Sequence, residues 1–101
     1  MSISTQYSKD NDTLRIHIRG RFDFHVHREF RKAYDNLQEI PAKFVIDLDG
    51  TEYMDSSALG MLLLLRERVG PDMCNIDIIN ANDVVKEILK ISNFNQLFNI
   101  N

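Results

Sequence analysis

Two serines stand where the most apolar helix of this chain is expected to begin. Ser56 and Ser57 follow Asp55, and the run from Leu59 to Leu65 after them is too apolar for an ordinary surface helix. A hydroxyl at a helix N-terminus is well placed to carry a phosphate, because free N–H groups and the helix dipole favour negative charge. Plain N-capping is the alternative role, and the two roles are compatible. The residues alone do not separate Ser56 from Ser57.

A second candidate for chemistry is the acidic segment Asp47-Leu-Asp-Gly-Thr51, which follows the apolar run Phe44-Val-Ile46. It resembles the first motif of haloacid-dehalogenase-type phosphatases, in which one aspartate attacks phosphate, the next is the acid or base, and magnesium binds between them. That class also needs a larger doubly wound domain, a catalytic lysine and a further acidic pair, which the rest of the chain does not supply. This phosphatase is therefore the remote alternative, and a polar turn at Asp49-Gly50 is favoured.

Other kinds of catalytic or metal site are not expected. The Gly-x-Ser-x-Gly motif of serine hydrolases is absent from the sequence. His25 and His27 are two positions apart, so on a helix they would point in different directions, and no cysteine or acidic cluster completes a metal site. Cys74 is the one cysteine and has no internal disulfide partner. We predict no catalytic residue, no metal and no other cofactor.

The first half of the chain provides the elements that must position the serines. Weak alternation over residues 1–6 predicts an edge strand, and Leu14, Ile16 and Ile18 alternate with polar residues as in a half-buried strand. Gly20 is expected to end or bulge that strand. Asp23 is expected to cap a helix. The apolar stripe of that helix comprises Val26, Phe30, Ala33, Tyr34 and Leu37.

The second half of the chain begins with the apolar strand at residues 44–46. A loop over 47–55 leads into the leucine-rich helix, which Gly70-Pro71 stops. The next strand has Cys74, Ile76 and Ile78 on one side. Asn80 to Asp83 offers caps for a last helix, whose stripe comprises Val84, Val85, Ile88, Leu89 and Ile91. Asn93 is expected to end that helix in a left-handed conformation, before an apolar tail of Leu97, Phe98 and Ile100.

The order of these elements predicts an α/β fold. Strands separated by helices imply parallel pairing with right-handed crossovers. A chain of 101 residues fits one domain with one core, spanning residues 1–101. We therefore expect a small mixed sheet, mostly parallel in its centre, packed against three to four helices.

The segment Tyr53-Met-Asp-Ser-Ser-Ala-Leu-Gly60, followed by the leucine run, resembles the phosphorylation motif of the STAS-domain family, specifically the bacterial anti-anti-sigma factors (anti-sigma factor antagonists). Gly20-Arg-Phe-Asp23 is similar to the family's Gly-x-Leu-Asp before its first helix. Ile91-Ser-Asn-Phe94, with Leu97-Phe98, resembles the closing segment. The resemblance covers nearly the whole chain and implies a STAS-like fold. Ala58 departs from the family pattern, which usually has glycine there.

The resemblance implies a partner-switching protein that catalyses nothing. Carried over residue by residue, Ser56 is the phosphorylated residue, Asp55 is the motif aspartate beside Ser57, and Asp23 is the acid brought near them. The unphosphorylated protein would bind an anti-sigma factor or serine protein kinase, phosphorylation would end the binding, and a PP2C-type phosphatase would reset it. The alternative implied function is a STAS signalling or scaffold module whose output is not a sigma factor.

The leucine run predicts where the partner binds. Met61 to Leu65 covers every direction around a helix, so in a small domain some of Met61, Leu64 and Leu65 should be exposed. Exposed methionine and leucine beside a modifiable serine would form a partner-binding surface.

Composition restricts the class of partner and the compartment. The formal net charge of −3 and the pI of about 5.5 argue against nucleic-acid binding, which needs a basic face. No signal peptide is recognisable, and the longest apolar run is far short of the ~20 residues that a membrane helix needs. We therefore expect a cytoplasmic protein, with no membrane or nucleic-acid partner, and a monomer.

Overall fold

The computed structural model describes residues 3–35, 37–70 and 75–101. Its helices are α1 (His27–Asp35), α2 (Ser56–Val69) and α3 (Asp83–Ile91), with 3₁₀ turns η1 (Phe24–Val26) and η3 (Phe94–Gln96). Its strands are β1 (Ile3–Ser8), β2 (Thr13–Ile18), β3 (Gly20–Phe22), β4 (Lys43–Asp47), β5 (Thr51–Met54), β6 (Ile76–Ile79) and β7 (Asn99–Ile100).

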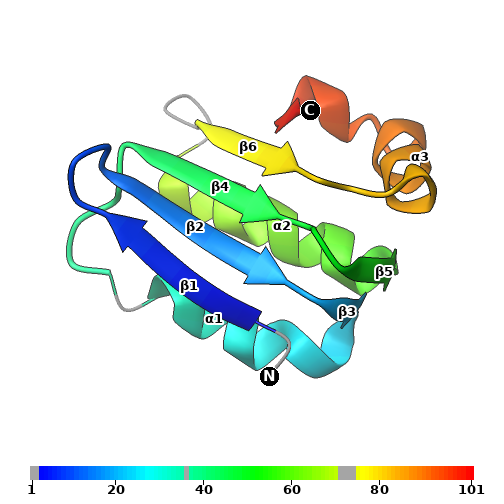
Figure 1. Ribbon diagram of the computed structural model, residues 1–101, viewed down its shortest axis with the longest axis horizontal. Coiled ribbons are helices and arrows are strands. Elements are labelled where there is room, and N and C mark those ends of the chain that lie inside the picture. The colour runs from blue at the N-terminus through cyan, green and yellow to red at the C-terminus, as the bar shows by residue number, and fades with distance from the viewer. Residues whose placement is uncertain (1–2, 36, 71–74) are drawn as a thin grey trace.

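The main sheet has five strands in the spatial order β1-β2-β4-β6-β7 (Figure 1). β1 runs antiparallel to β2, whereas β2, β4, β6 and β7 pair in parallel. Helices α1 and α2 lie together on one face of the sheet, and α3 lies beside β5 at one end (Figure 1). The predicted α/β fold is therefore confirmed, with three α-helices in the described part of the chain. None of the described helices combines the length and the apolarity that crossing a membrane requires.

Alternation along the strands separates a core face from a polar face. The core face of β2, β4 and β6 is buried under the helices and consists of Leu14, Ile16, Ile18, Phe44, Ile46, Ile76 and Ile78. The opposite face carries two ion pairs, between Arg15 and Asp47 at 3.2 Å and between Lys43 and Asp77 at 2.8 Å. This is the pattern of a sheet that packs against helices on one side only.

The loop expected over residues 47–55 contains a strand, so that prediction was wrong in part. β5 pairs in parallel with β3, and the register shifts between Gly20 and Arg21, where Gly20 has a φ of +79°. The strand that Gly20 was expected to end or bulge thus ends just before it, at Ile18, and the irregularity at Gly20 belongs to β3. Within β5, Thr51 and Met54 are buried and the two residues between them face outward.

Thr51 holds the small sheet to the main sheet. Its buried hydroxyl donates to the Ile18 carbonyl at 2.6 Å, and its N–H donates to the Leu48 carbonyl at 2.9 Å. Its own carbonyl accepts from the Asn82 side chain at 3.1 Å. Thr51 thus ties the ends of β2 and β4 to the start of α3.

Two helix starts follow the caps expected from the sequence: Asp23 caps η1, which leads into α1, and Asn82 caps α3. The cap of α2 is Asp55, so the alternative that Ser56 or Ser57 is the N-cap was wrong. Gly70 ends α2, and Asn93 has the left-handed φ of 60° after α3. Pro71 and Cys74 lie outside the described residues.

The burial of two helices differs from the sequence-based expectation. Met61 and Leu65 of α2 are buried, so they cannot provide an exposed partner surface in this fold. Val84 and Ile91 of α3, which were expected in its buried stripe, are instead exposed. A helix of nine residues at the end of a sheet buries only a narrow stripe, formed here by Val85 and Leu89.

Replacing Thr51 by valine should destabilise the fold. The variant keeps the shape of the side chain but leaves the buried Ile18 carbonyl without its donor, which costs about 1–3 kcal/mol. Urea unfolding followed by circular dichroism measures the loss. Thr5→Val, on the exposed part of β1, is the matched control and should be nearly neutral. Equal stability of the two variants would contradict the anchoring role.

Candidate functional site

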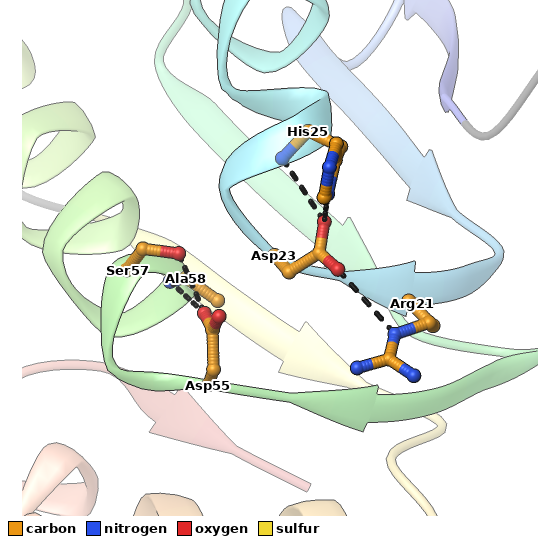
Figure 2. A network of polar contacts seen from close by, with 6 residues as sticks. All are labelled: Arg21, Asp23, His25, Asp55, Ser57 and Ala58. Carbon is orange, nitrogen blue, oxygen red and sulfur yellow. Dashed lines mark hydrogen bonds and ion pairs between the residues drawn. The ribbon is translucent and has the colours of Figure 1, made fainter.

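Two loops meet at the carboxyl ends of β3 and β5. Parallel pairing places Phe22 opposite Met54, and the Asp55 N–H donates to the Phe22 carbonyl at 3.4 Å. Asp23 and Asp55 therefore follow neighbouring strands at the same edge (Figure 2). The structure thus brings together the two acids that the sequence assigned to one site.

Asp23 is held by its own loop. One carboxylate oxygen accepts from the His25 N–H at 3.0 Å and lies 3.2 Å from the His25 ring nitrogen Nδ1. The other accepts from Arg21 Nε at 3.4 Å. The His25 N–H is the main reason that the pKa of Asp23 is lowered; burial opposes it, and the His25 ring and Arg21 add to it. The buried Asp23 side chain is therefore a carboxylate at neutral pH.

Asp55 forms a hydrogen bond with the side chain of one of the two serines only. Its Oδ1 accepts from the Ser57 hydroxyl at 2.6 Å and from the Ala58 N–H at 3.1 Å, as a helix cap does. Ser57 is half-buried, whereas Ser56 is exposed at the first position of α2. No hydrogen bond joins the Ser56 hydroxyl to another described residue. Ser56 is thus the serine whose hydroxyl is open to a second protein.

The carboxylates of Asp23 and Asp55 share no hydrogen-bond partner within the described ranges. In Figure 2 the contacts of Asp23 stay with Arg21 and His25, and those of Asp55 stay with Ser57 and Ala58. Both carboxylates are thus already used to hold the backbone. This arrangement is suited to presenting the Ser56 hydroxyl on a rigid surface. It is less suited to a reaction in which the two carboxylates act together.

Exposed aromatic side chains occur on both segments that meet at this edge, and sequence analysis missed them. Phe24 is 65% exposed and stacks on the His27 ring at 4.9 Å, and Tyr53 is 42% exposed. The Arg21 guanidinium lies 5.2 Å from the centre of the Tyr53 ring, a cation–π contact. An aromatic residue directly after Asp23 and another just before Asp55 were the available signals.

The outward face of α2 also carries exposed apolar side chains. Leu64 is 59% exposed, as expected, and Leu63 is 38% exposed. Leu63 lies about two turns after Ser56 on nearly the same side of the helix. The exposed leucines of this run are therefore Leu63 and Leu64, whereas Met61 and Leu65 are buried. We call Ser56, Phe24, Tyr53, Leu63 and Leu64 the switch surface.

Comparison with known proteins identifies the family. The family described as "Mlab, STAS domain" matches residues 5–99. The chain belongs to the STAS-domain family. A STAS-domain containing protein of Pseudomonas aeruginosa (strain UCBPP-PA14) is 48% identical over 100 residues, which cover 99% of each chain.

Solved structures with low sequence identity share the STAS fold. An anti-sigma factor antagonist from Mycobacterium paratuberculosis matches with a TM-score of 0.75 at 16% identity, over 98% of this chain and 85% of that one. The anti-sigma factor antagonist SpoIIAA in its unphosphorylated form matches with a TM-score of 0.71 at 15% identity, over 88% and 82%. Phosphorylated Bacillus SpoIIAA matches with a TM-score of 0.68 at 14% identity, over 98% and 90%.

Asp47, the candidate nucleophile of the phosphatase hypothesis, has a structural role in this STAS domain. Its carboxylate accepts from the Asn80 side chain at 3.0 Å, the Asp49 N–H at 3.0 Å and Arg15 at 3.2 Å. Burial alone would raise the pKa of Asp47, but these donors and the nearby His17 outweigh it and lower the pKa. In the described part of the chain, no three His, Cys, Asp or Glu side chains are grouped as metal ligands would be.

Asp47→Asn should lower the free energy of unfolding at neutral pH. It should also make that free energy change less as the pH falls. The wild-type carboxylate has a lowered folded-state pKa, so its contribution is present above the unfolded value of about 3.9 and is lost as pH falls through the folded value. Removing the charged acceptor should cost about 1–3 kcal/mol at pH 7. Urea unfolding at pH 7 and pH 3 measures both effects.

The difference in free energy of unfolding between the wild type and Asp47→Asn should therefore be smaller at pH 3 than at pH 7. Asp49→Asn is the matched control, because the Asp49 side chain is exposed and only its N–H contacts Asp47. A constant difference at both pH values would show that the charge of Asp47 does not stabilise the fold.

Proposed function

We propose that this STAS domain is an anti-sigma factor antagonist controlled by phosphorylation of Ser56. Unphosphorylated, it binds an anti-sigma factor or serine protein kinase and keeps that partner from its usual target. The kinase phosphorylates Ser56 and ends the interaction, and a PP2C-type phosphatase restores binding. The domain itself catalyses no reaction in this cycle.

The exposure of Ser56 beside an already capped helix start is the observation that carries the proposal. Ser57 donates its hydroxyl to Asp55, so phosphorylating Ser57 would remove a contact that holds the cap. A kinase can reach Ser56 without disturbing that contact. The likeness to SpoIIAA in both unphosphorylated and phosphorylated forms supports a fold that tolerates such a modification.

The switch surface explains how one phosphate could control binding. Phe24, Tyr53 and Leu64 are large apolar side chains left in water, and a protein partner would gain by covering them. A phosphoserine adds a charge of about −1.5 to −2 at neutral pH. Covering that charge without a counter-ion typically costs several kcal/mol. Binding is then lost through local repulsion and desolvation, with the fold intact.

Asp55 and Asp23 strengthen this effect. Both lie at the same edge, and both keep their hydrogen bonds within their own loops. The charge of Asp55 already neutralises much of the attraction that the N-terminus of α2 offers to an anion. A phosphate on Ser56 would therefore make the local surface strongly acidic while changing the stability of α2 little.

Protein isolated from cells that contain its kinase should carry one phosphate, on Ser56. Tandem mass spectrometry of the phosphopeptide gives the position. Ser56→Ala should abolish the modification, and Ser57→Ala is the control that should retain it. A phosphate found on Ser57 in the wild type would contradict the assignment of the site.

Ser56→Asp should lose partner binding while keeping the fold, and Ser56→Ala should keep both. The acidic side chain places a charge on the switch surface, whereas alanine leaves that surface neutral. The partner is recovered with the Ser56→Ala protein, and its affinity for each variant is measured by calorimetry. Circular dichroism and melting temperature test the fold. An unfolded Ser56→Asp protein, or one that binds as well as Ser56→Ala, would refute the mechanism.

A charge placed further along α2 tests how far the switch surface extends, with partner affinity again measured by calorimetry. Leu63→Glu should weaken binding at least tenfold, which corresponds to about 1.4 kcal/mol. Ile91→Glu is the matched control, because Ile91 is an exposed aliphatic residue at the far end of α3. Equal effects of the two substitutions would restrict the contact to the loops around Ser56.

A further inference from the structure

The outward face of α1 carries an excess of positive charge. Arg28, Arg31 and Lys32 are exposed there, and with His27 and Asp35 they surround a hollow of about 260 Å³. Asp35 is already bound to Arg31, at 3.6 Å. Among the described residues, neither Arg28 nor Lys32 forms an ion pair. The chain as a whole has a formal net charge of −3, so this face is opposite in sign to the rest of the protein.

The spacing of these cations does not stabilise the helix that carries them. Residues three and four positions apart are neighbours on a helix surface, so Arg28 lies beside both Arg31 and Lys32. Like charges at these spacings are destabilising. The other acid of α1, Glu29, is half-buried on the side that lines a groove with β1. Folding of α1 therefore does not account for the three cations, whereas binding of an acidic molecule would.

The basic face of α1 adjoins two members of the switch surface. At the start of α1, the His27 ring stacks on Phe24 at 4.9 Å. Further along, Arg31 and Asp35 also line a groove of about 340 Å³ between α1 and α2, which contains Leu64. A partner that covers both Phe24 and Leu64 would therefore also contact the outward face of α1.

The α2 side of this groove adds no net charge. Besides Leu64, it consists of Glu67 and Arg68, one acid and one base. The excess of positive charge thus stays on α1, next to exposed apolar side chains. A complementary surface would combine carboxylates with apolar groups.

Resting on the function proposed above, we propose that the partner bound at the switch surface lays an acidic segment along α1. Its carboxylates pair with Arg28 and Lys32, and its apolar side chains contact Phe24 and Leu64. Complementary charges at such a contact mainly speed association and fix the orientation of the partner. The partner is thus a protein whose contact surface includes an acidic, amphipathic segment.

A polypeptide suits this face better than a nucleic acid or an anionic membrane. Both of those carry negative charge over a wide area and would soon meet Asp35, Glu67 and the other acids of a chain with negative net charge. A protein segment can place carboxylates opposite Arg28 and Lys32 alone. It can also supply the apolar side chains that cover the switch surface.

Synthetic peptides test this site. The probe is the blocked octapeptide Leu-Glu-Glu-Leu-Leu-Glu-Glu-Leu, titrated into the ¹⁵N-labelled full chain and followed by amide chemical shifts. We expect shift changes confined to η1, α1 and the part of α2 around Leu64. The same peptide with glutamine in place of every glutamate should bind about tenfold more weakly at low salt. This difference should become smaller at about 1 M salt, where the Debye length is about 3 Å.

Charge reversal on two helices tests the contact with α1. Arg28→Glu/Lys32→Glu should weaken binding of the acidic peptide about tenfold at low salt. Lys86→Glu/Lys90→Glu on α3 is the matched control, because it also reverses two exposed cations four positions apart and changes the net charge equally. The control should bind as the wild type does. Circular dichroism and melting temperature verify that both variants fold, and Arg28→Gln/Lys32→Gln, which only removes the charges, should give a smaller loss.

The peptide tests require neither the kinase nor a phosphate, so they are separate from the tests of Ser56. If the acidic peptide fails to bind while Ser56→Asp still loses the partner, the acidic segment is wrong and the proposed function stands. If the peptide binds α1 while Ser56→Asp keeps the partner, the phosphorylation switch is wrong and the acidic contact stands.

Several results would overturn the proposal. They are the absence of binding at millimolar peptide, shift changes centred elsewhere, and equal weakening by the α3 control. Preferential binding of an oligothymidine strand or of phosphatidylglycerol vesicles at α1 would replace the acidic protein by a nucleic acid or a membrane. Analytical ultracentrifugation tests the remaining occupant: a dimer that Arg28→Glu/Lys32→Glu abolishes would show that a second copy of the chain covers this face.

Discussion

The buried hydroxyl of Thr51 is the contact on which the functional end of the domain depends. It bridges to the Ile18 carbonyl at the end of β2, while the Thr51 backbone bonds to Leu48 and Asn82. These bonds set where β5 lies, and β5 sets where α2 begins. Parallel pairing with β3 then brings Asp23 to the same edge as Asp55. The position of Ser56 is thus fixed by a hydrogen bond in the interior, several residues before it in the chain.

The cap of α2 involves one of the two adjacent serines and leaves the other free of it. Asp55 accepts from the Ser57 hydroxyl and the Ala58 N–H, so the first turn is closed without Ser56. The Ala58 methyl group is buried in the core, which explains why alanine is acceptable where the family usually has glycine. A cap that does not use Ser56 leaves its hydroxyl available for modification at little cost to the fold. The proposed phosphorylation and the capping of the helix would therefore use neighbouring residues but different atoms.

The sequence was sufficient for the order of the main elements and for caps at Asp23 and within residues 80–83, because both depend on local patterns. It did not show that Asp55, rather than either serine, caps α2. It was not sufficient for β5, a short strand whose pairing with β3 depends on contacts far apart in the chain. The leucine run also could not show which of its members are buried, since apolar residues occupy every side of that helix. Only packing in the folded domain buries Met61 and Leu65 and leaves Leu63 and Leu64 in water. Ser56 and Ser57 look alike in sequence, and the Ser57–Asp55 hydrogen bond distinguishes them.

Phosphorylation of Ser56 would act through local charge. The switch surface surrounds one hydroxyl with apolar side chains, so a single charge can make its burial unfavourable. A charge at Ser56 is screened by salt beyond a Debye length of about 8 Å. The effect of the phosphate would therefore stay at this end of the domain, and a partner contact elsewhere on the domain would not feel it.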